Sequence, residues 1–449
     1  MTKRIVVIGG GAAGASAASR ARRLDPSAEV ILVEASNMIT HGPCAIPYYV
    51  EGIVKDKKML VTYTAEEFER ERGIKVFINT VAKSIDVDKK VVVLERNGKE
   101  FSIEWSKLVI ATGAIPAKPK VDGVDAKNVH VIRHPAQVDE LYEAVRSAKT
   151  VAIVGGSYLG LEMAEAVVAL GKKVILIEKE AQLLPKTLDS DMADIVAKEV
   201  ESKGVELHLS ESLKEIIGNH SVKAVATNKN VYDADLVILA TGVKPNVELA
   251  VKSGIKLGIT SAIDVNEFLE TNIEDVYAAG DVAEKKHIVT GKRVWIPLAP
   301  AANKEGQVAG ANSVLGRFLR FPGVVGTAIT KFFDMFIART GLGEEEARMH
   351  GFNVESKLVK VRTKAHYYPK GSYALIKMIV ESGSGRILGV QIIGWEEAVA
   401  EYINVAALAV EKGMTIDDLF FADIGYHPAV APVWHPLIVA ARVLSHGRF

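Results

Sequence analysis

The stretch RIVVIGGGAAGASAASRARRL at residues 4–24 joins an apolar run, a glycine-rich turn and an alanine-rich run. This order is typical of a buried strand followed by a helix that packs on it. Gly9, Gly11 and Gly14 form GxGxxG, whose glycines allow the turn, the approach of a diphosphate and close helix packing. The next apolar run, EVILVE, ends at Glu34, where a carboxylate can accept ribose hydroxyls. We therefore predict a dinucleotide-binding βαβ unit.

A second copy of this pattern lies in TVAIVGGSYLGLEMAEAVVAL at residues 150–170. Gly155 and Gly160 stand at the first and third positions, while Ser157 replaces the middle glycine. Because serine is small, dinucleotide binding is the favoured interpretation, and a degenerate unit that binds nothing is the alternative. The second strand of this unit, KVILIE, ends at Glu178.

Glu178 also bears on which nicotinamide nucleotide the second unit takes. A carboxylate at this position repels a 2′-phosphate and so favours NADH. Lys179 follows it directly, and its positive charge softens that preference. We expect NADH to be preferred and NADPH to be tolerated.

The phrase NIEDVYAAGDVA at residues 272–283 adds a third element. Asp281 follows a strand-like run and Gly280, where a carboxylate can hold the ribityl chain of a flavin nucleotide. Taken alone, such a loop is common, and Asp281 could instead cap the next helix. Together with the two glycine loops, it predicts FAD in the first unit and a nicotinamide nucleotide in the second. From about residue 321, alternating apolar runs indicate a third, α+β domain.

Composition limits the classes of partner. The chain has 55 Lys and Arg against 55 Asp and Glu, so no global field favours nucleic acid or an anionic membrane as main partner. The apolar stretches are too short to span a bilayer, and the N-terminus does not read as a secretory signal. One cysteine excludes a disulfide framework and a thiolate metal cluster, so we expect no metal site and a cytoplasmic location.

Several motifs give the sequence a resemblance to a known family over essentially its whole length. They are GGGAAG at residues 9–14, PCAIPYYVEG at 43–52, ATG turns at 111–113 and 240–242, YAAGD at 277–281, TKFFD at 330–334, HYYP at 366–369 and APVWHPL at 431–437. The sequence resembles the pyridine nucleotide–disulfide oxidoreductases with one redox cysteine, most closely the coenzyme A disulfide reductases and related archaeal NAD(P)H oxidases and NAD(P)H sulfur oxidoreductases. The resemblance implies a homodimer in which each active site uses both subunits.

The predicted fold class is α/β, with two Rossmann-like dinucleotide-binding domains, for FAD and NAD, and a C-terminal α+β dimerisation domain. We expect the FAD-binding domain at residues 1–115 and 245–320 and the NAD(P)H-binding domain at 116–244. The dimerisation domain is expected at 321–449. The second dinucleotide unit is therefore inserted in the chain of the first.

Cys44 is the only cysteine. Family members with two cysteines cycle an internal disulfide, so a redox bond of Cys44 must be a mixed disulfide with a small thiol, a sulfenic acid or a persulfide. Attack needs the thiolate, so we expect a lowered pKa for this thiol, helped by a helix that CAIPYYV opens. His41 either adds positive charge nearby or is a simple turn residue.

Tyrosine hydroxyls of the partner subunit are implied, by the resemblance, to assist the departing thiolate. The candidates are Tyr426 and either Tyr367 or Tyr368, for which an interface aromatic is the alternative. By the same resemblance, Tyr158 covers the flavin until nicotinamide displaces it, and Glu162 holds the nicotinamide carboxamide.

The other predicted contacts gather at the glycine loops, the ATG turns and the PLAPAANKEG run at residues 297–306. The predicted FAD contacts are Gly9, Gly11, Ala13, Gly14, Glu34, Ala35, Thr112, Gly113, Gly280, Asp281, Pro297, Leu298 and Ala299. The predicted NAD contacts are Gly155, Ser157, Tyr158, Leu159, Gly160, Glu162, Glu178 and Gly242. The predicted coenzyme A contacts, for whose arginines a solvated helix face is the alternative, are Ala12, Arg20, Arg23, Thr40 and Arg72.

Three functions remain open at this point. The first is FAD-dependent reduction of coenzyme A disulfide, or of polysulfide or sulfur, by NAD(P)H through a mixed disulfide of Cys44. The second is an NADH oxidase in which oxygen is the acceptor and Cys44 cycles as a sulfenic acid. The third is a flavoprotein redox sensor. Peroxide-reducing members carry histidine where this sequence has Ala12, which disfavours a peroxidase.

Overall fold

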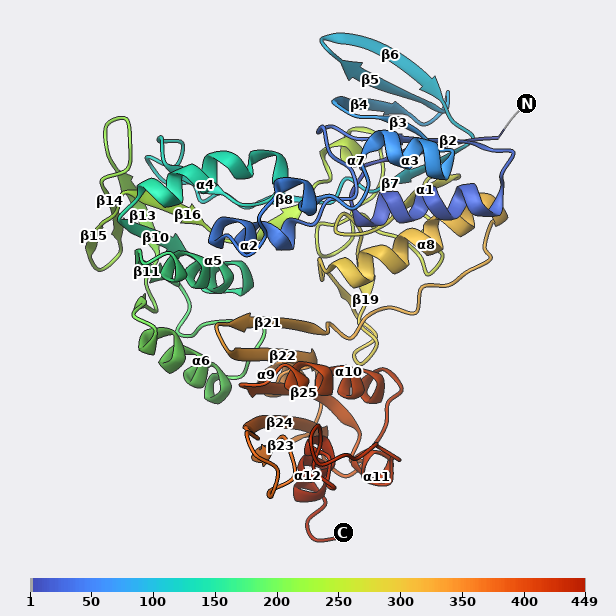
Figure 1. The fold of residues 1–449 in the computed structure, drawn as a ribbon. Helices are drawn as coiled ribbons and strands as arrows, with labels where there is room; N and C mark the ends of the chain where they lie inside the picture. The colour runs from blue at the N-terminus through green and yellow to red at the C-terminus, as the bar shows by residue number, and fades with distance from the viewer. Residues whose placement is uncertain (1–2, 449) are drawn as a thin grey trace.

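The computed structural model describes residues 3–448 and contains two parallel five-stranded sheets and one antiparallel five-stranded sheet (Figure 1). The first parallel sheet has the order β18-β7-β1-β2-β3. These strands are β1 (Arg4–Ile8), β2 (Glu29–Val33), β3 (Lys75–Phe77), β7 (Lys107–Ile110) and β18 (Val276–Ala278). β18 pairs with β7 although the whole second sheet lies between them in the sequence.

The second parallel sheet has the order β12-β11-β10-β16-β9. Its strands are β9 (Val129–Val131), β10 (Thr150–Val154), β11 (Lys173–Ile177), β12 (Glu206–His208) and β16 (Leu236–Leu239). The central strands of both sheets are buried along almost their whole length, as expected for parallel strands covered on both faces. The register repeats as well, since Ile8 pairs with Val33 as Val154 pairs with Ile177.

Different elements cover the helix that follows each glycine loop. α1 (Ala12–Leu24) lies along α8 (Ala299–Leu315), and both run across the first unit in Figure 1. The two helices approach closely because α8 carries glycine at the contact: a Cβ on Gly306 would lie 2.2 Å from the carbonyl oxygen of Ala13. In the second unit, α5 (Tyr158–Ala169) faces β21 (Ala328–Phe332) of the antiparallel sheet.

The antiparallel sheet forms the C-terminal part, with the order β21-β22-β25-β24-β23. Its other strands are β22 (Met335–Gly341), β23 (Val354–Arg362), β24 (Tyr373–Glu381) and β25 (Ile387–Gly394). The helices packed with it are α9 (Glu344–Met349), α10 (Ala398–Glu411), α11 (Ile416–Phe420) and α12 (Pro436–Leu444). Its apolar core is fully buried and continuous between sheet and helices.

The remaining elements are short strands and helices on the two parallel units. The strands are β4 (Thr80–Asp86), β5 (Val91–Arg96), β6 (Lys99–Glu104), β8 (Ala114–Pro116), β13 (Leu213–Ile217), β14 (Ala224–Thr227), β15 (Val231–Asp233), β17 (Val243–Pro245), β19 (Lys285–Lys286) and β20 (Arg293–Val294). The helices are α2 (Ile46–Glu51), α3 (Ala65–Arg72), α4 (Val138–Ser147), α6 (Ser190–Ser202) and α7 (Glu248–Lys252), with 3₁₀ turns η1 (Pro43–Ala45), η2 (Lys57–Leu60) and η3 (Pro135–Gln137).

The predicted fold class is confirmed: two parallel Rossmann-like units are followed by an α+β unit. The chain passes between the two parallel units twice, in β8 and β17, which pair with each other as an antiparallel ribbon. Among residues 3–448, no helix combines the length and the apolar character needed to cross a bilayer.

Candidate active site

The first glycine loop has a reason for each of its glycines. Gly9 has φ +107°, and a Cβ there would lie 2.2 Å from the carbonyl oxygen of Ala111. A Cβ on Gly14 would lie 1.8 Å from the carbonyl oxygen of Gly9, so the helix can approach the strand only with glycine. A Cβ on Gly11 would meet no atom within 4 Å. The open space at the middle position is where a dinucleotide diphosphate would pass.

Two further features of this loop fit a dinucleotide. α1 begins after Gly11 without a side-chain cap and with no acidic residue in its first turn, so its first N–H groups are available to an anion. Glu34 follows β2, and its carboxylate accepts hydrogen bonds from the N–H groups of Gly10 (2.8 Å) and Ser36 (2.7 Å). The carboxylate is thereby fixed beside the loop, with Ala35 next in sequence.

The other predicted FAD residues surround the same loop. Gly280 has φ +85°, and a Cβ there would lie 2.7 Å from the Cβ of Ala13, so the turn before Asp281 rests on the start of α1. Pro297, Leu298 and Ala299 lead into α8, which begins without a side-chain cap. The last two predicted positions close the ATG turn after β7: the hydroxyl of Thr112 donates to the carbonyl oxygen of Asn246 (2.8 Å), and Gly113 has φ +69°.

The second loop repeats the geometry. Gly155 has φ +110°, and a Cβ on Gly160 would lie 1.8 Å from the carbonyl oxygen of Gly155. Ser157 occupies the cap position of α5 without forming a side-chain cap. The carboxylate of Glu178 accepts from the N–H groups of Gly156 (2.6 Å) and Glu180 (2.9 Å), as Glu34 does in the first unit.

The remaining predicted NAD positions lie around this loop. Gly242, in the second ATG turn, has φ +92°. Tyr158 and Leu159, in the first turn of α5, are partly buried against the core of the second unit, and burial raises the pKa of the Tyr158 hydroxyl.

Cys44 lies in η1, one turn before α2, and part of its surface is exposed. The 3₁₀ turn η1 runs directly into α2, so the prediction that CAIPYYV opens a helix is confirmed, with Cys44 in its first, 3₁₀ turn. The prediction of a lowered pKa is wrong: burial, and then the carboxylate of Glu162, raise the pKa of the Cys44 thiol, while Arg133 opposes them. The thiol of one chain therefore needs help from elsewhere to ionise.

Residues of both parallel units and of the C-terminal sheet meet around Cys44. Glu162 of α5 accepts a hydrogen bond from the hydroxyl of Thr330 in β21 (2.9 Å), and burial raises the pKa of its carboxyl group. One turn further along α5, the buried carboxylate of Glu165 forms an ion pair with Lys331, the next residue of β21. The ammonium group of Lys331 also lies 5.8 Å from the ring centre of Tyr48 in α2.

Asp281 belongs to the same junction. Its carboxylate forms an ion pair with Arg133, from the segment that follows β9 (3.1 Å). Its carbonyl oxygen accepts from the indole N–H of Trp295 (2.7 Å). The predicted residues Cys44, Asp281 and Glu162 are thus brought near one another, since both carboxylates act on the pKa of the thiol.

His41 packs against His134, with ring centres 4.1 Å apart. Burial lowers the pKa of His41 to about 4 and also lowers the pKa of His134, although Glu34 opposes both shifts. His41 is therefore neutral at physiological pH, and the alternative in which it adds positive charge beside Cys44 is wrong.

The candidate tyrosines lie in the C-terminal unit. The hydroxyl groups of Tyr367 and Tyr426 are hydrogen-bonded to each other at 2.7 Å, and both side chains are exposed. Tyr368 is the neighbour in sequence, but the hydroxyl of Tyr426 contacts that of Tyr367. Tyr367 lies in the loop between β23 and β24. These two strands are at the edge of the sheet opposite to β21 (Figure 1). Within one chain, this edge is about 20 Å from the strand that faces Cys44.

The predicted coenzyme A residues form two groups. Thr40 and Arg72 meet at Tyr63: the Thr40 hydroxyl donates to the Tyr63 carbonyl oxygen (2.9 Å), and the Arg72 guanidinium donates to the Tyr63 hydroxyl (3.0 Å). The other group lies on α1, where Arg23 donates to the side chain of Gln307 (2.9 Å) and is exposed. Ala12 and Arg20 belong to this helix too.

Residues 3–306 match the family described as pyridine nucleotide-disulphide oxidoreductase, and residues 327–437 match its dimerisation domain. The chain belongs to this family. Its members use FAD and NAD(P)H, so the predictions of an oxidoreductase and of these two cofactors are confirmed. The open position at Gly11, the uncapped start of α1 and the fixed carboxylate of Glu34 fit the first of these cofactors.

Individual relatives cover nearly the whole of this oxidoreductase. It is 46% identical over 447 residues to a Pyrococcus horikoshii protein named NAD(P)H coenzyme A polysulfide/persulfide reductase, covering 99% of each chain. It is 38% identical to a Methanocaldococcus jannaschii protein named NADH oxidase, covering 98% of each chain. Among solved structures, the NAD-dependent persulfide reductase from A. fulgidus gives a TM-score of 0.96 at 39% identity, covering 99% of this chain and 83% of that one.

The sequence did not point to several residues of this oxidoreductase's site. Arg133 stands in a segment without a family motif. Tyr63 lies between the motif PCAIPYYVEG at residues 43–52 and the ATG turn at 111–113. Thr330 and Lys331 belong to the motif TKFFD, which identified the family but gave no contact. Arg133, Thr330 and Lys331 reach the site through contacts with residues more than a hundred positions away, which no local pattern signals.

Proposed function

We propose that this oxidoreductase reduces coenzyme A disulfide, or a polysulfide or persulfide carried by coenzyme A, at the expense of NAD(P)H, with Cys44 as its redox sulfur. The observation that carries the proposal is the position of the chain's only thiol. It lies where the FAD unit, the nicotinamide unit and β21 meet, next to Asp281 and Glu162. The P. horikoshii relative, whose name specifies coenzyme A polysulfide/persulfide, supports the substrate class.

In the proposed arrangement, residues 1–115 and 245–320 hold FAD, residues 116–244 hold NAD(P)H, and residues 321–449 form the dimer contact. FAD is held at Gly9, Gly11, Gly14 and Glu34 and at the Gly280–Asp281 turn. Bound FAD supplies a two-electron relay between the nicotinamide and sulfur. NAD(P)H is held at the second glycine loop, with Glu178 at its ribose.

The sulfur chemistry then runs through Cys44. The Cys44 thiolate attacks one sulfur of the entering disulfide, the S–S bond breaks, and one coenzyme A thiol leaves with a proton. A mixed disulfide remains on Cys44. Two electrons from NAD(P)H and a second proton break this bond, release the second thiol and restore the thiolate. The balance is one NAD(P)H and one proton consumed for each disulfide and two thiols formed.

The leaving thiol needs a proton donor, because the groups near Cys44 in one chain raise the pKa of its thiol instead of stabilising an anion. We assign this role to Tyr426 and Tyr367 of the partner subunit, whose hydroxyls share a hydrogen bond and form one donor unit. Exposed apolar residues around this pair favour a homodimer: Phe421, Val430, Val433 and Trp434 are all exposed in one chain.

Coenzyme A is anionic, and the two groups of predicted contact residues described above include three arginines that could bind its phosphates. We propose that Arg20 and Arg23 on α1 and Arg72 beside Tyr63 contact its phosphates. Ala12 and Thr40 would contact the same ligand. A single cysteine, which cannot form a disulfide within the chain, also fits a cytoplasmic location.

Mass spectrometry of the purified protein tests the proposal. Cys44 should carry an adduct that contains the pantetheine arm, released by a thiol reductant. In parallel, Cys44→Ser should lose at least about a thousandfold in kcat for coenzyme A disulfide while dye reduction by NADH persists. A variant that still reduces coenzyme A disulfide at the wild-type rate would exclude Cys44 as the nucleophile.

The relative named NADH oxidase, 38% identical, makes oxygen the second candidate acceptor. In that case, the resting Cys44 would be a sulfenic acid and would carry no pantetheine adduct. Turnover measured side by side with coenzyme A disulfide, polysulfide and oxygen separates the two functions.

A further inference from the structure

A buried lysine and a buried glutamate face each other beneath the Gly280–Asp281 turn. The side chains of Lys285 in β19 and Glu305 in α8 have no exposed surface, and Lys285 Nζ lies 3.2 Å from Glu305 Oε1. Burying two charges is expensive, and replacing such a pair by apolar residues is often neutral or stabilising. Stability alone therefore does not explain the pair.

Both members of the pair bind the same residue. Glu305 Oε2 accepts a hydrogen bond from the N–H of Gly280 (2.7 Å), and Lys285 Nζ donates to the carbonyl oxygen of Gly280 (2.9 Å) and to that of Ala283 (3.2 Å). Gly280 has φ +85°, and it precedes the aspartate that pairs with Arg133. Both polar groups of one left-handed residue are thus held by a single charged pair.

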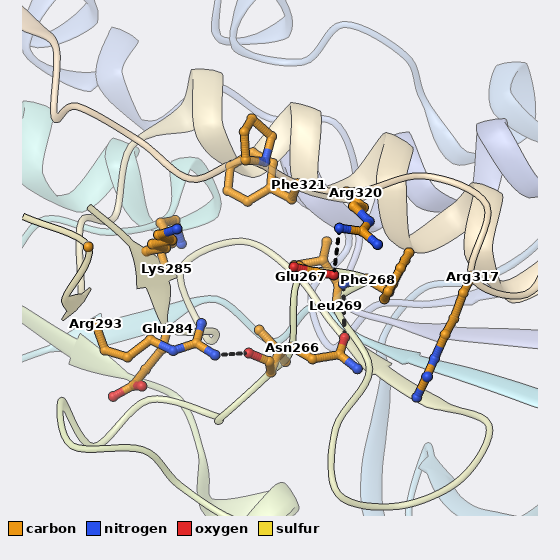
Figure 2. A pocket seen from close by; sticks show the side chains of 14 residues that line it. Asn266, Glu267, Phe268, Leu269, Glu284, Lys285, Arg293, Arg317, Arg320 and Phe321 are labelled. Carbon is orange, nitrogen blue, oxygen red and sulfur yellow. Dashed lines mark hydrogen bonds and ion pairs between the residues drawn. The ribbon is translucent and has the colours of Figure 1, made fainter. Parts of the chain in front are cut away.

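The Lys285 side chain points into the protein, unlike that of its neighbour Lys286. Lys285 belongs to the lining of a pocket of about 650 Å³, together with both basic and acidic residues. Figure 2 shows Lys285 on one side of this pocket, with Arg293 and Arg320 among the other lining residues. The neighbouring Lys286 is exposed. Lys285 instead turns inward, away from water, to reach Gly280.

We propose that the Lys285–Glu305 pair is a positioning device for the flavin site. By fixing the Gly280 peptide groups, it sets the direction of the Asp281 carboxylate and thereby how firmly FAD is held. This inference rests on the proposed placement of FAD at the Gly280–Asp281 turn. Neither residue touches the reacting atoms, so both act through Gly280.

The test uses the holoenzyme and removes both charges together. Lys285→Met/Glu305→Met keeps the volume and leaves no lone buried charge, so the fold should persist, as checked by thermal unfolding. FAD release, followed by the recovery of flavin fluorescence, should become about tenfold faster, because hydrogen bonds to charged groups are lost. The visible absorbance bands of the bound flavin should also shift. The matched control is Lys286→Met, on the same strand, which should release FAD at the wild-type rate.

A second variant covers a failure to fold. Glu305→Gln keeps an oxygen that can accept from the Gly280 N–H but loses the charge, so FAD release should be about threefold faster, between wild type and the double variant. Wild-type release and an unchanged flavin spectrum, in the double variant if it folds and otherwise in Glu305→Gln, would overturn the proposal. A wild-type protein that carries no FAD would instead refute the placement of the cofactor, which is a different result.

Discussion

In both glycine units, the first glycine is left-handed, at φ +107° for Gly9 and +110° for Gly155, and the third lies against the carbonyl oxygen of the first. The repeat extends beyond the motif. Thr40 and Leu184 both have positive φ, and they donate their N–H groups to the carbonyl oxygens of Gly10 and Gly156, which directly follow the first glycine of each loop. The two units differ in their middle residue, Gly11 against Ser157, and in what covers the helix.

The difference in cover fits the proposed placement of a resident ligand in the first unit and an exchanging one in the second. α1 is locked against α8 by main-chain contact at Gly306 and Gly310, and the buried Lys285–Glu305 pair lies beneath the same site. α5 is held instead by side chains, through Glu162 and Glu165, against a strand of another unit. A backbone-packed site opens reluctantly, which suits a cofactor that stays, whereas a site built on side chains suits a nucleotide that leaves in every cycle.

Adding one methyl group to the third glycine of each loop should produce the largest difference between the two units. Gly14→Ala and Gly160→Ala each place a Cβ 1.8 Å from a carbonyl oxygen, so the helix must move, at a cost of several kcal/mol. We expect Gly14→Ala to yield protein without FAD. Gly160→Ala should retain FAD and lose about a hundredfold in the rate of flavin reduction by NADH, while dithionite still reduces it.

Absorbance at the flavin bands gives the FAD content, and stopped flow gives the reduction rate. If Gly160→Ala lost FAD and Gly14→Ala kept it, the assignment of the two loops to their nucleotides would be reversed.

Removing the cation that covers α5 should have the next largest effect. Lys331→Met leaves the carboxylate of Glu165 buried and unpaired, which lowers the free energy of unfolding by about 3 kcal/mol. Lys331→Met/Glu165→Met should recover most of the loss. Urea unfolding followed by circular dichroism measures both.

The matched control removes a side-chain contact between α1 and α8, the helix that covers it. Ser16→Ala removes an exposed hydrogen bond from α1 to Asn303 of α8 and should change the free energy of unfolding by less than about 0.5 kcal/mol. Equal effects at the two sites would show that side chains hold both helices alike.

Exchanging the middle residues of the two loops, Gly11 and Ser157, tests how much space each loop leaves for its nucleotide. Gly11→Ser meets no atom of the protein within 4 Å at its Cβ, so the fold should be unchanged, but the side chain enters the space assigned to the diphosphate. We expect FAD affinity to fall about tenfold, an effect of ~1.4 kcal/mol. Ser157→Gly should change the KM for NADH by less than about threefold. Titration of the FAD-stripped protein with FAD, by fluorescence quenching, measures the first effect; wild-type affinity would place the diphosphate elsewhere.

The parts of the fold and of the candidate site that the sequence could predict are those whose contacting residues lie close together in the chain. The strands, glycine turns and terminal acids are local patterns of about thirty residues, so both units were predictable. Arg133 and Lys331 were not, because their partners are more than a hundred residues away in other units. The pKa of Cys44 was predicted in the wrong direction because it depends first on how far the thiol is buried and then on Glu162, and the sequence places neither.

The choice between Tyr367 and Tyr368 shows the same limit on a smaller scale. Adjacent residues in a loop have no periodicity that separates them. Only the return of the chain at Tyr426 selects one hydroxyl, through the bond at 2.7 Å. The motif HYYP is local, so the sequence could name two candidate tyrosines, and the tertiary contact shows only which of them lies against Tyr426.

The smallest expected effect concerns a titratable group that only the first unit has. Where the second unit has Pro185 after its positive-φ residue, the first has His41, buried against His134 and facing Glu34 and Arg133. Its pKa is lowered to about 4 in the folded chain, below the 6.5 of an exposed histidine.

The unfolded chain therefore binds a proton between pH 6.5 and 4 that the folded chain refuses, so this stability is fully present above pH 6.5 and is lost on acidification. His41→Phe keeps the ring contact and cannot bind a proton. Between pH 7 and 5.5, its free energy of unfolding should fall by about 1 kcal/mol less than that of wild type. His220→Phe removes an exposed histidine of the second unit and serves as the control. Parallel urea unfolding curves at the two pH values measure this difference. If the free energy of unfolding of His41→Phe fell with pH as much as that of wild type, another group of the first unit would set the sensitivity of the protein to acid.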